Sequence, residues 1–125
     1  FLKKENICQP PEWFERVMEQ GCCWLNTSLT FTSTDQSDLK RHLNFWKPII
    51  EVILQTIVTA KSKLVASGKK TGLVVVLWGG HAKKLKKVIE NFNAKCDPKV
   101  DIAYVEANHP AVESFVYPHL SKLVT

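Results

Sequence analysis

The chain has 125 residues, of which 45% are hydrophobic and 23% charged, and this composition is typical of one globular domain. No apolar run approaches the roughly 18 residues that a membrane-spanning helix needs, so we expect no membrane association. The net charge of +5 favours a polyanionic partner such as nucleic acid, although a soluble basic domain without one fits the charge equally well.

The cysteines, at positions 8, 22, 23 and 96, lack the spacing of a metal site or a redox motif. No C-x-x-C pair occurs, and Cys22 and Cys23, as neighbours on a strand, would point to opposite faces. We therefore predict no metal, no cofactor, and reduced thiols in an intracellular protein.

The first part of the chain predicts a helix followed by a short strand. The Pro10-Pro11 pair suits the first turn of a helix, and Gly21 suits its end. Between them runs one apolar stripe, made of Trp13, Phe14, Val17 and Met18. Residues 22–25 form a short apolar run that we interpret as a strand, ending in a polar turn at residues 26–30. Residues 32–38 are rich in Ser, Thr and Asp, which is typical of a loop.

A long helix is predicted in the middle of the chain. Apolar residues recur at steps of three and four between Phe45 and Leu64. Because proline disrupts a helix interior, Pro48 predicts that the regular helix begins about there. Gly68 suits the end of this helix.

The most apolar stretch of the chain predicts its central strand. Residues 73–77 are all apolar and three of them are β-branched, which favours a strand buried on both faces of a parallel sheet. Gly79-Gly80 ends this strand, and residues 81–93 then show helical spacing. Residues 100–105 predict a third strand, and Tyr117-Pro118 opens a short terminal helix.

The alternation of helices and strands predicts a parallel sheet with helical crossovers. Ligands collect at the carboxyl ends of such strands, where Asn26, residues 79–81 and residues 108–110 would meet. An Asn amide can read a base edge, a His in a dry pocket can stabilise an oxyanion, and amides at a helix start can hold phosphate. Each signal also has an ordinary interpretation. The Asn is then a turn residue, the His a loop residue, and the Gly-Gly pair only the end of a strand, while the lysines form a solvated helix face.

Two blocks of sequence resemble the family 1 uracil-DNA glycosylases. Residues 20–30, Gln-Gly-Cys-Cys-Trp-Leu-Asn-Thr-Ser-Leu-Thr, are similar to that family's apolar strand ending in Leu-Asn, with a Leu-Thr after it. Residues 72–84 are similar to its apolar strand ending in Leu-Trp-Gly and to the helix that follows. Residues 108–110 fall where the family has its His-Pro-Ser-Pro-Leu-Ser motif, and residues 119–122 resemble its closing segment. Order and spacing match across essentially the whole chain.

The resemblance implies one α/β domain over residues 1–125, with three layers, αβα, and a small parallel sheet of about three strands, a truncated form of the family's fold. It implies that Asn26 recognises a flipped uracil and that His109 stabilises the departing uracil anion during N-glycosidic hydrolysis, the first step of base excision repair. It also implies a protein located in the nucleus or at other sites of viral or cellular DNA. Contacts with the DNA backbone would come from Gly79, Gly80, His81, Lys83, Lys84 and Ser114.

The chain also departs from the family's pattern. The family's first motif serine, a phosphate contact, is Ala111 here, and its wedging leucine is Glu113, a carboxylate that phosphates repel. The family's water-activating aspartate lies in an upstream Gly-Gln-Asp-Pro-Tyr-His motif that nothing in this chain matches. A matching motif before Phe1 would favour the enzyme, and its absence would favour a binding module. The aspartates that are present, at positions 35, 38, 97 and 101, have none of the surroundings of that motif.

An interior strand of the family's sheet is missing along with that aspartate. The predicted strand at residues 22–25 would then pair directly with the strand at residues 73–78, pair with another chain, or leave an open edge. We favour direct pairing slightly over a second chain or protein partner that completes the sheet.

Three interpretations of function follow. The chain is the carboxyl-terminal part of a uracil-DNA glycosylase, or a degenerate glycosylase-like module that binds DNA or protein without catalysis, or an unrelated α/β domain. The changed His-Pro motif favours the second interpretation over a competent enzyme, whereas the retained Asn26 and His109 favour the first. Two matching blocks in the right order make the third the weakest. We predict that the isolated chain does not excise uracil, and that its DNA binding is weak and salt-sensitive.

Overall fold

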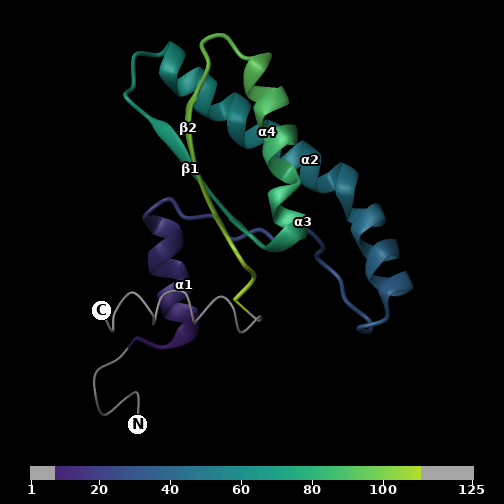
Figure 1. The fold of residues 1–125 in the computed structure, drawn as a ribbon. Coiled ribbons are helices and arrows are strands. Elements are labelled where there is room, and N and C mark those ends of the chain that lie inside the picture. Colours follow the sequence, from purple (N-terminus) through teal and green to yellow (C-terminus); the bar gives the residue numbers. More distant parts are fainter. Residues whose placement is uncertain (1–7, 111–125) are drawn as a thin grey trace, which may run out of the picture.

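The computed structural model describes residues 8–110 as a mixture of helices and a small parallel sheet (Figure 1). The elements in chain order are α1 (Pro10–Glu19), α2 (Gln36–Ala66), β1 (Gly72–Trp78), α3 (Gly79–Lys83), α4 (Leu85–Ala94) and β2 (Asp101–Ala107). The predicted α/β character is therefore confirmed, while the predicted terminal helix at Tyr117-Pro118 lies outside the described residues. No helix within residues 8–110 has both the length and the apolar character needed to cross a bilayer.

The sheet consists of β1 and β2, which run parallel and side by side in the part of the chain described. Gly72 lies opposite Asp101 at one end, and Trp78 lies opposite Ala107 at the other. The chain returns from β1 to β2 through α3 and α4, the helical crossover that a parallel pair requires. Both predicted strands in this half of the chain are thus confirmed.

The strand predicted at residues 22–25 is wrong, because this segment belongs to neither strand of the sheet. Its largest side chain, Trp24, packs instead against Trp78, with 5.9 Å between ring centroids. The contact of this segment with β1 is therefore made by ring packing and not by strand pairing.

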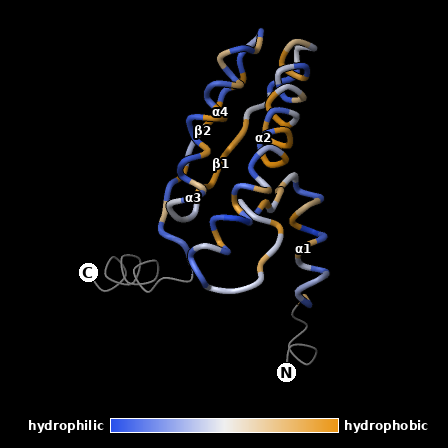
Figure 2. The backbone as a smooth tube through the Cα atoms, turned by 90° about the vertical axis from the view of Figure 1, so that its right-hand side faces the viewer, coloured by the Kyte–Doolittle hydropathy of each residue, from blue (hydrophilic) through white to orange (hydrophobic). Residues whose placement is uncertain are grey.

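Helices α2 and α4 pack against the same face of the sheet. Val58 of α2, Ile89 of α4 and Val100 just before β2 are each at most 4% exposed and form one hydrophobic cluster. The inward side chains of both strands join it, at positions 73, 75, 102 and 104. Figure 2 shows β1 coloured hydrophobic along its length, with α2 and α4 beside it.

The opposite face of the sheet remains open to solvent. Val74 is 67% exposed, and Val76 and Val105 are each 50% exposed. Successive side chains of a strand point to opposite faces, and the described helices cover only one of them. The prediction that the central strand is buried on both faces is therefore wrong for the described part of the molecule.

Helix α2 begins earlier than predicted. The Asp35 carboxylate accepts hydrogen bonds from the backbone N–H of Ser37 at 2.8 Å and of Asp38 at 3.3 Å, which caps the first turn. The helix then continues through Pro48 for a total of 31 residues, so the predicted start at that proline is wrong. Gly68, with a φ of +80°, follows the last turn and confirms the predicted end.

Candidate functional site

The parallel register brings the ends of β1 and β2 into contact. Gly79 directly follows β1, and His109 lies two residues beyond β2. A Cβ built on Gly79 would lie 3.2 Å from the His109 Cβ and 3.6 Å from its Cδ2. With a φ of +85°, Gly79 also adopts a backbone conformation that suits glycine. The glycine turn and the histidine that the sequence singled out therefore touch.

Asn26 belongs to a segment that reaches the same end of the sheet. Trp24, two residues before it, packs against Trp78, the last residue of β1. Figure 1 shows α1 and the segment after it near the end where the strands finish. The Asn26 side chain itself is exposed.

The histidine at this edge is accessible to water. His109 and its neighbour Asn108 are both exposed, as are Gly80 and His81 across from them. An imidazole stabilises a developing oxyanion best in a dry, low-dielectric pocket. The arrangement therefore suits contact with a ligand at the surface better than chemistry in an enclosed site.

The helix that begins at the Gly-Gly pair is too short to form a strong anion site. The predicted helix at residues 81–93 is divided at Lys84 into α3, of five residues, and α4. Fewer aligned peptide dipoles contribute to the field at the start of α3 than in a longer helix. Lysine side chains, rather than backbone amides, are thus the better candidates for holding phosphate here.

The lysines after β1 differ in their surroundings. Lys83 is half-buried at the end of α3, whereas Lys84 and Lys87 are exposed. Lys86 donates a hydrogen bond of 2.9 Å to Glu106, which raises the lysine pKa and lowers the pKa of the carboxyl group. Of the backbone contacts that the resemblance implies, only Ser114 lies outside the described residues.

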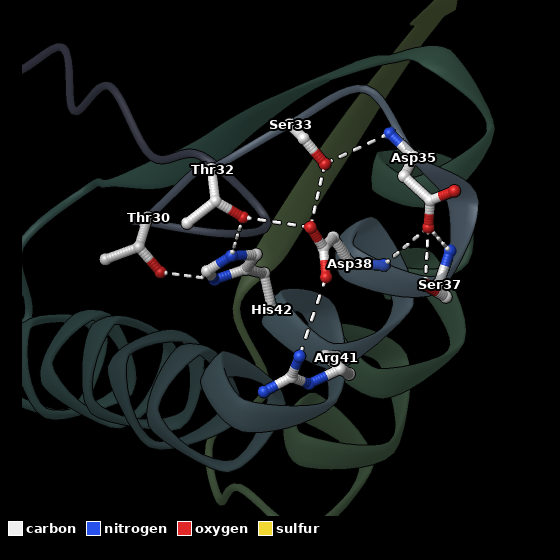
Figure 3. Close-up of polar contacts among 8 residues, drawn as sticks. All are labelled: Thr30, Thr32, Ser33, Asp35, Ser37, Asp38, Arg41 and His42. Atoms are coloured by element: carbon white, nitrogen blue, oxygen red, sulfur yellow. Dashed lines mark hydrogen bonds and ion pairs between the residues drawn. The ribbon is translucent and has the colours of Figure 1, made fainter.

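Sequence reasoning missed a hydrogen-bonded cluster around His42, in the first turns of α2 (Figure 3). Its Nδ1 lies 2.7 Å from Thr30 Oγ1, and its Nε2 lies 3.0 Å from Thr32 Oγ1. Trp46 Nε1 donates to Thr30 Oγ1 at 2.7 Å, and the Thr32 hydroxyl donates to Asp38 at 3.4 Å. Because the one Thr32 proton is used on Asp38, His42 Nε2 is the donor in its hydrogen bond with Thr32 Oγ1.

The Asp38 carboxylate, at the other end of this cluster, also has polar partners. Ser33 donates to Asp38 at 2.8 Å, which is the main reason that the pKa of this carboxyl group lies below its usual value. Arg41 lies 3.5 Å from the same carboxylate. With Asn44 and Phe45, the cluster lines an open hollow. The hydrogen bonds of this cluster hold residues 30–33 against α2.

Within residues 8–110, no group of three or more His, Cys, Asp or Glu side chains is placed to hold a metal ion. The cysteines at positions 8, 22, 23 and 96 are free thiols. Comparisons with protein families, with characterised proteins and with solved structures found no match to this chain.

Proposed function

We propose that this protein is a non-catalytic, uracil-DNA glycosylase-like module that binds nucleic acid at the carboxyl end of its parallel strands. The observation that carries the proposal is the contact between Gly79 and His109, where an ideal Cβ on the glycine would be 3.2 Å from the histidine. It joins two of the sequence blocks on which the resemblance rests. The exposed Lys84 and Lys87 supply positive charge just beyond this edge.

The positions of the aspartates support binding without catalysis. Asp101 opens β2, about 20 Å from the carboxyl end of this seven-residue strand, and Asp97 lies in the bend before it. Asp35 caps α2, and Asp38 accepts hydrogen bonds from Ser33 and Thr32. These carboxylates are either remote from His109 or already engaged, and none of them is placed to activate a water molecule beside it.

The open face of the sheet supports a further part of the proposal. Parallel sheets are normally covered on both faces, whereas Val74 and Val105 remain at least half exposed. We propose that a third layer, supplied by a partner chain, covers this face and completes an αβα arrangement.

The proposed binding is tested by fluorescence anisotropy with labelled DNA over a salt series. We expect weak binding that falls steeply between about 50 and 200 mM salt, because phosphate contacts release counterions. Replacing Lys84 and Lys87 by Gln should weaken binding. Replacing Lys69 and Lys70 by Gln removes the same charge at the opposite end of β1 and should have a smaller effect.

A uracil-release assay on single-stranded DNA separates binding from catalysis. We expect no free uracil, and we expect Asn26→Ala to leave the affinity for uracil-containing DNA nearly unchanged. Release of uracil by the chain, abolished in His109→Ala, would instead establish a glycosylase. Equal effects of the two lysine pairs would contradict binding at the carboxyl end.

A further inference from the structure

A continuous group of aromatic rings lies beside the carboxyl end of β1. Trp24 is at its centre, with centroids 6.0 Å from Trp13, 6.0 Å from Phe14 and 5.9 Å from Trp78. Trp13 and Phe14 are themselves 5.0 Å apart in an edge-to-face arrangement. We call these four residues the aromatic cluster. It connects α1, the segment after it and the end of the sheet.

The rings of this cluster are far from buried. Trp13, Phe14 and Trp24 are 44–46% exposed, and Trp78 is 36% exposed. Aromatic side chains contribute most to the free energy of folding or binding when they are buried away from water. Four adjacent, half-exposed rings therefore form a surface that another planar group can cover.

The charges around the cluster favour an anionic ligand. On the helical wheel of α1, Trp13 and Phe14 share one side with Val17 and Met18, and the acidic residues lie on the opposite side. Glu12 is also paired with Arg16 at 2.5 Å. From Trp78 the chain passes directly into α3, so Lys83 follows within about 8 Å of helix rise. The chain therefore places Lys83 close to the Trp78 end of the cluster, whereas the acidic residues of α1 lie away from its rings.

We propose that the aromatic cluster is a stacking platform for unpaired bases, so that the nucleic acid bound by this protein is single-stranded. This inference rests on the proposed function and names the class of ligand for it. Bases stack on Trp24 and its neighbouring rings, while Lys83, Lys84 and Lys87 hold the phosphates. Stacking needs an unpaired base, because a base inside a duplex already stacks on its neighbours.

The test compares Trp24→Leu with Trp24→Phe in the full 125-residue chain. Leucine keeps apolar bulk but lacks a flat ring, whereas phenylalanine keeps the ring, so the pair separates stacking from packing. Anisotropy is measured with a labelled oligothymidine of about 15 nucleotides and with a duplex of the same length. Circular dichroism confirms that each variant is folded. Phe45→Leu, which removes an exposed ring outside the cluster, is the matched control.

We expect Trp24→Leu to weaken binding of the oligothymidine roughly tenfold, and Trp24→Phe to retain most of it. Duplex binding should change little in either variant, and Phe45→Leu should bind like the unchanged protein. Intrinsic tryptophan fluorescence should fall when the oligothymidine binds, because bases stacked on tryptophan quench it. If Trp24→Leu fails to fold, this quenching, which is expected with the oligothymidine and not with the duplex, provides the second readout.

Three outcomes would overturn the inference. Equal affinity of Trp24→Leu and the unchanged chain for the oligothymidine, with binding still reduced by the Lys84 and Lys87 replacements, removes the platform but leaves the proposed function standing. Absence of binding to either DNA removes both. A dimer that sedimentation detects and that Trp24→Leu dissociates would assign the cluster to a protein interface instead.

Discussion

Asn93 and Val100 are joined by two hydrogen bonds that imitate the pairing of neighbouring strands. The Asn93 amide nitrogen donates to the Val100 carbonyl at 2.9 Å, and the Val100 N–H donates to Asn93 Oδ1 at 2.8 Å. Val100 is only 4% exposed, so these backbone groups have little access to water. The end of α4 is thereby fixed to the residue that precedes β2.

Replacement of Asn93 by Ala should destabilise the protein by about 2–3 kcal/mol, because it leaves a buried donor and a buried acceptor unsatisfied. The measurement is the free energy of unfolding in urea. Asn91→Ala, on the same helix but exposed, should change stability by less than about 0.5 kcal/mol. Similar losses in the two variants would argue that the hydrogen bonds to Val100 contribute little.

The Gly-Gly turn offers a second matched pair. Gly79→Ala should cost about 1–2 kcal/mol, because alanine disfavours a φ of +85° and its Cβ would press on His109 at 3.2 Å. Gly80→Ala meets nothing within 4 Å and lies in α3, so stability should be unchanged or rise by up to about 1 kcal/mol. Urea unfolding of both variants checks this, and a loss at Gly80 as large as that at Gly79 would contradict it.

The two faces of β1 should respond differently to a polar substitution. Val75→Thr places a hydroxyl against the hydrophobic cluster and should cost about 1–3 kcal/mol. Val74→Thr, on the open face where the side chain is 67% exposed, should cost less than about 0.5 kcal/mol. Thermal unfolding of the pair measures the contrast. An equal loss at both positions would indicate that the open face is covered in solution.

The ion pair between Lys86 and Glu106 should make stability depend on pH in a defined window. The hydrogen bond and charge of Lys86 lower the pKa of Glu106 in the folded protein. The contribution of Glu106 to the free energy of unfolding is therefore fully present above its usual pKa of 4.5, and it is lost as pH falls through the folded pKa. The pKa of Lys86 is raised, so its contribution is present below 10.5 and is lost as pH rises through the folded value.

Glu106→Gln should therefore lower the urea midpoint near neutral pH, with a difference from the unchanged protein that shrinks at about pH 3. Glu15→Gln, at an exposed position on α1, is the control for charge alone. A deficit in Glu106→Gln that is the same at both pH values would rule out the ion pair as its cause.

The sequence predicted correctly those helices and strands whose hydrophobic pattern fits only one kind of secondary structure. The apolar residues before Gly79 and the run before His109 specified two parallel strands, and helical spacing located the helix between them. A continuous apolar run says only that both faces of a strand can be buried, and it does not say that both are. That distinction depends on which helices are present to cover Val74 and Val76.

Other features depended on competing local signals. Pro48 suggested a helix start, but its effect was outweighed by the Asp35 cap and by apolar spacing on both sides of the proline. Asp35, a residue type that favours the N-cap of a helix, lies in the Ser- and Asp-rich segment that we interpreted as a loop. His42 gave no signal of its own, because its partners Thr30 and Thr32 come close only after residues 30–33 fold back onto α2.

The exposed valines also bear on how the protein melts. Unfolding normally raises the heat capacity because it exposes apolar groups to water for the first time. Val74, Val76 and Val105 are already hydrated to at least half their surface, so they add less to this increment. Calorimetry should find a slightly smaller heat-capacity change than a sheet covered on both faces would give, with the increment growing once a partner covers that face.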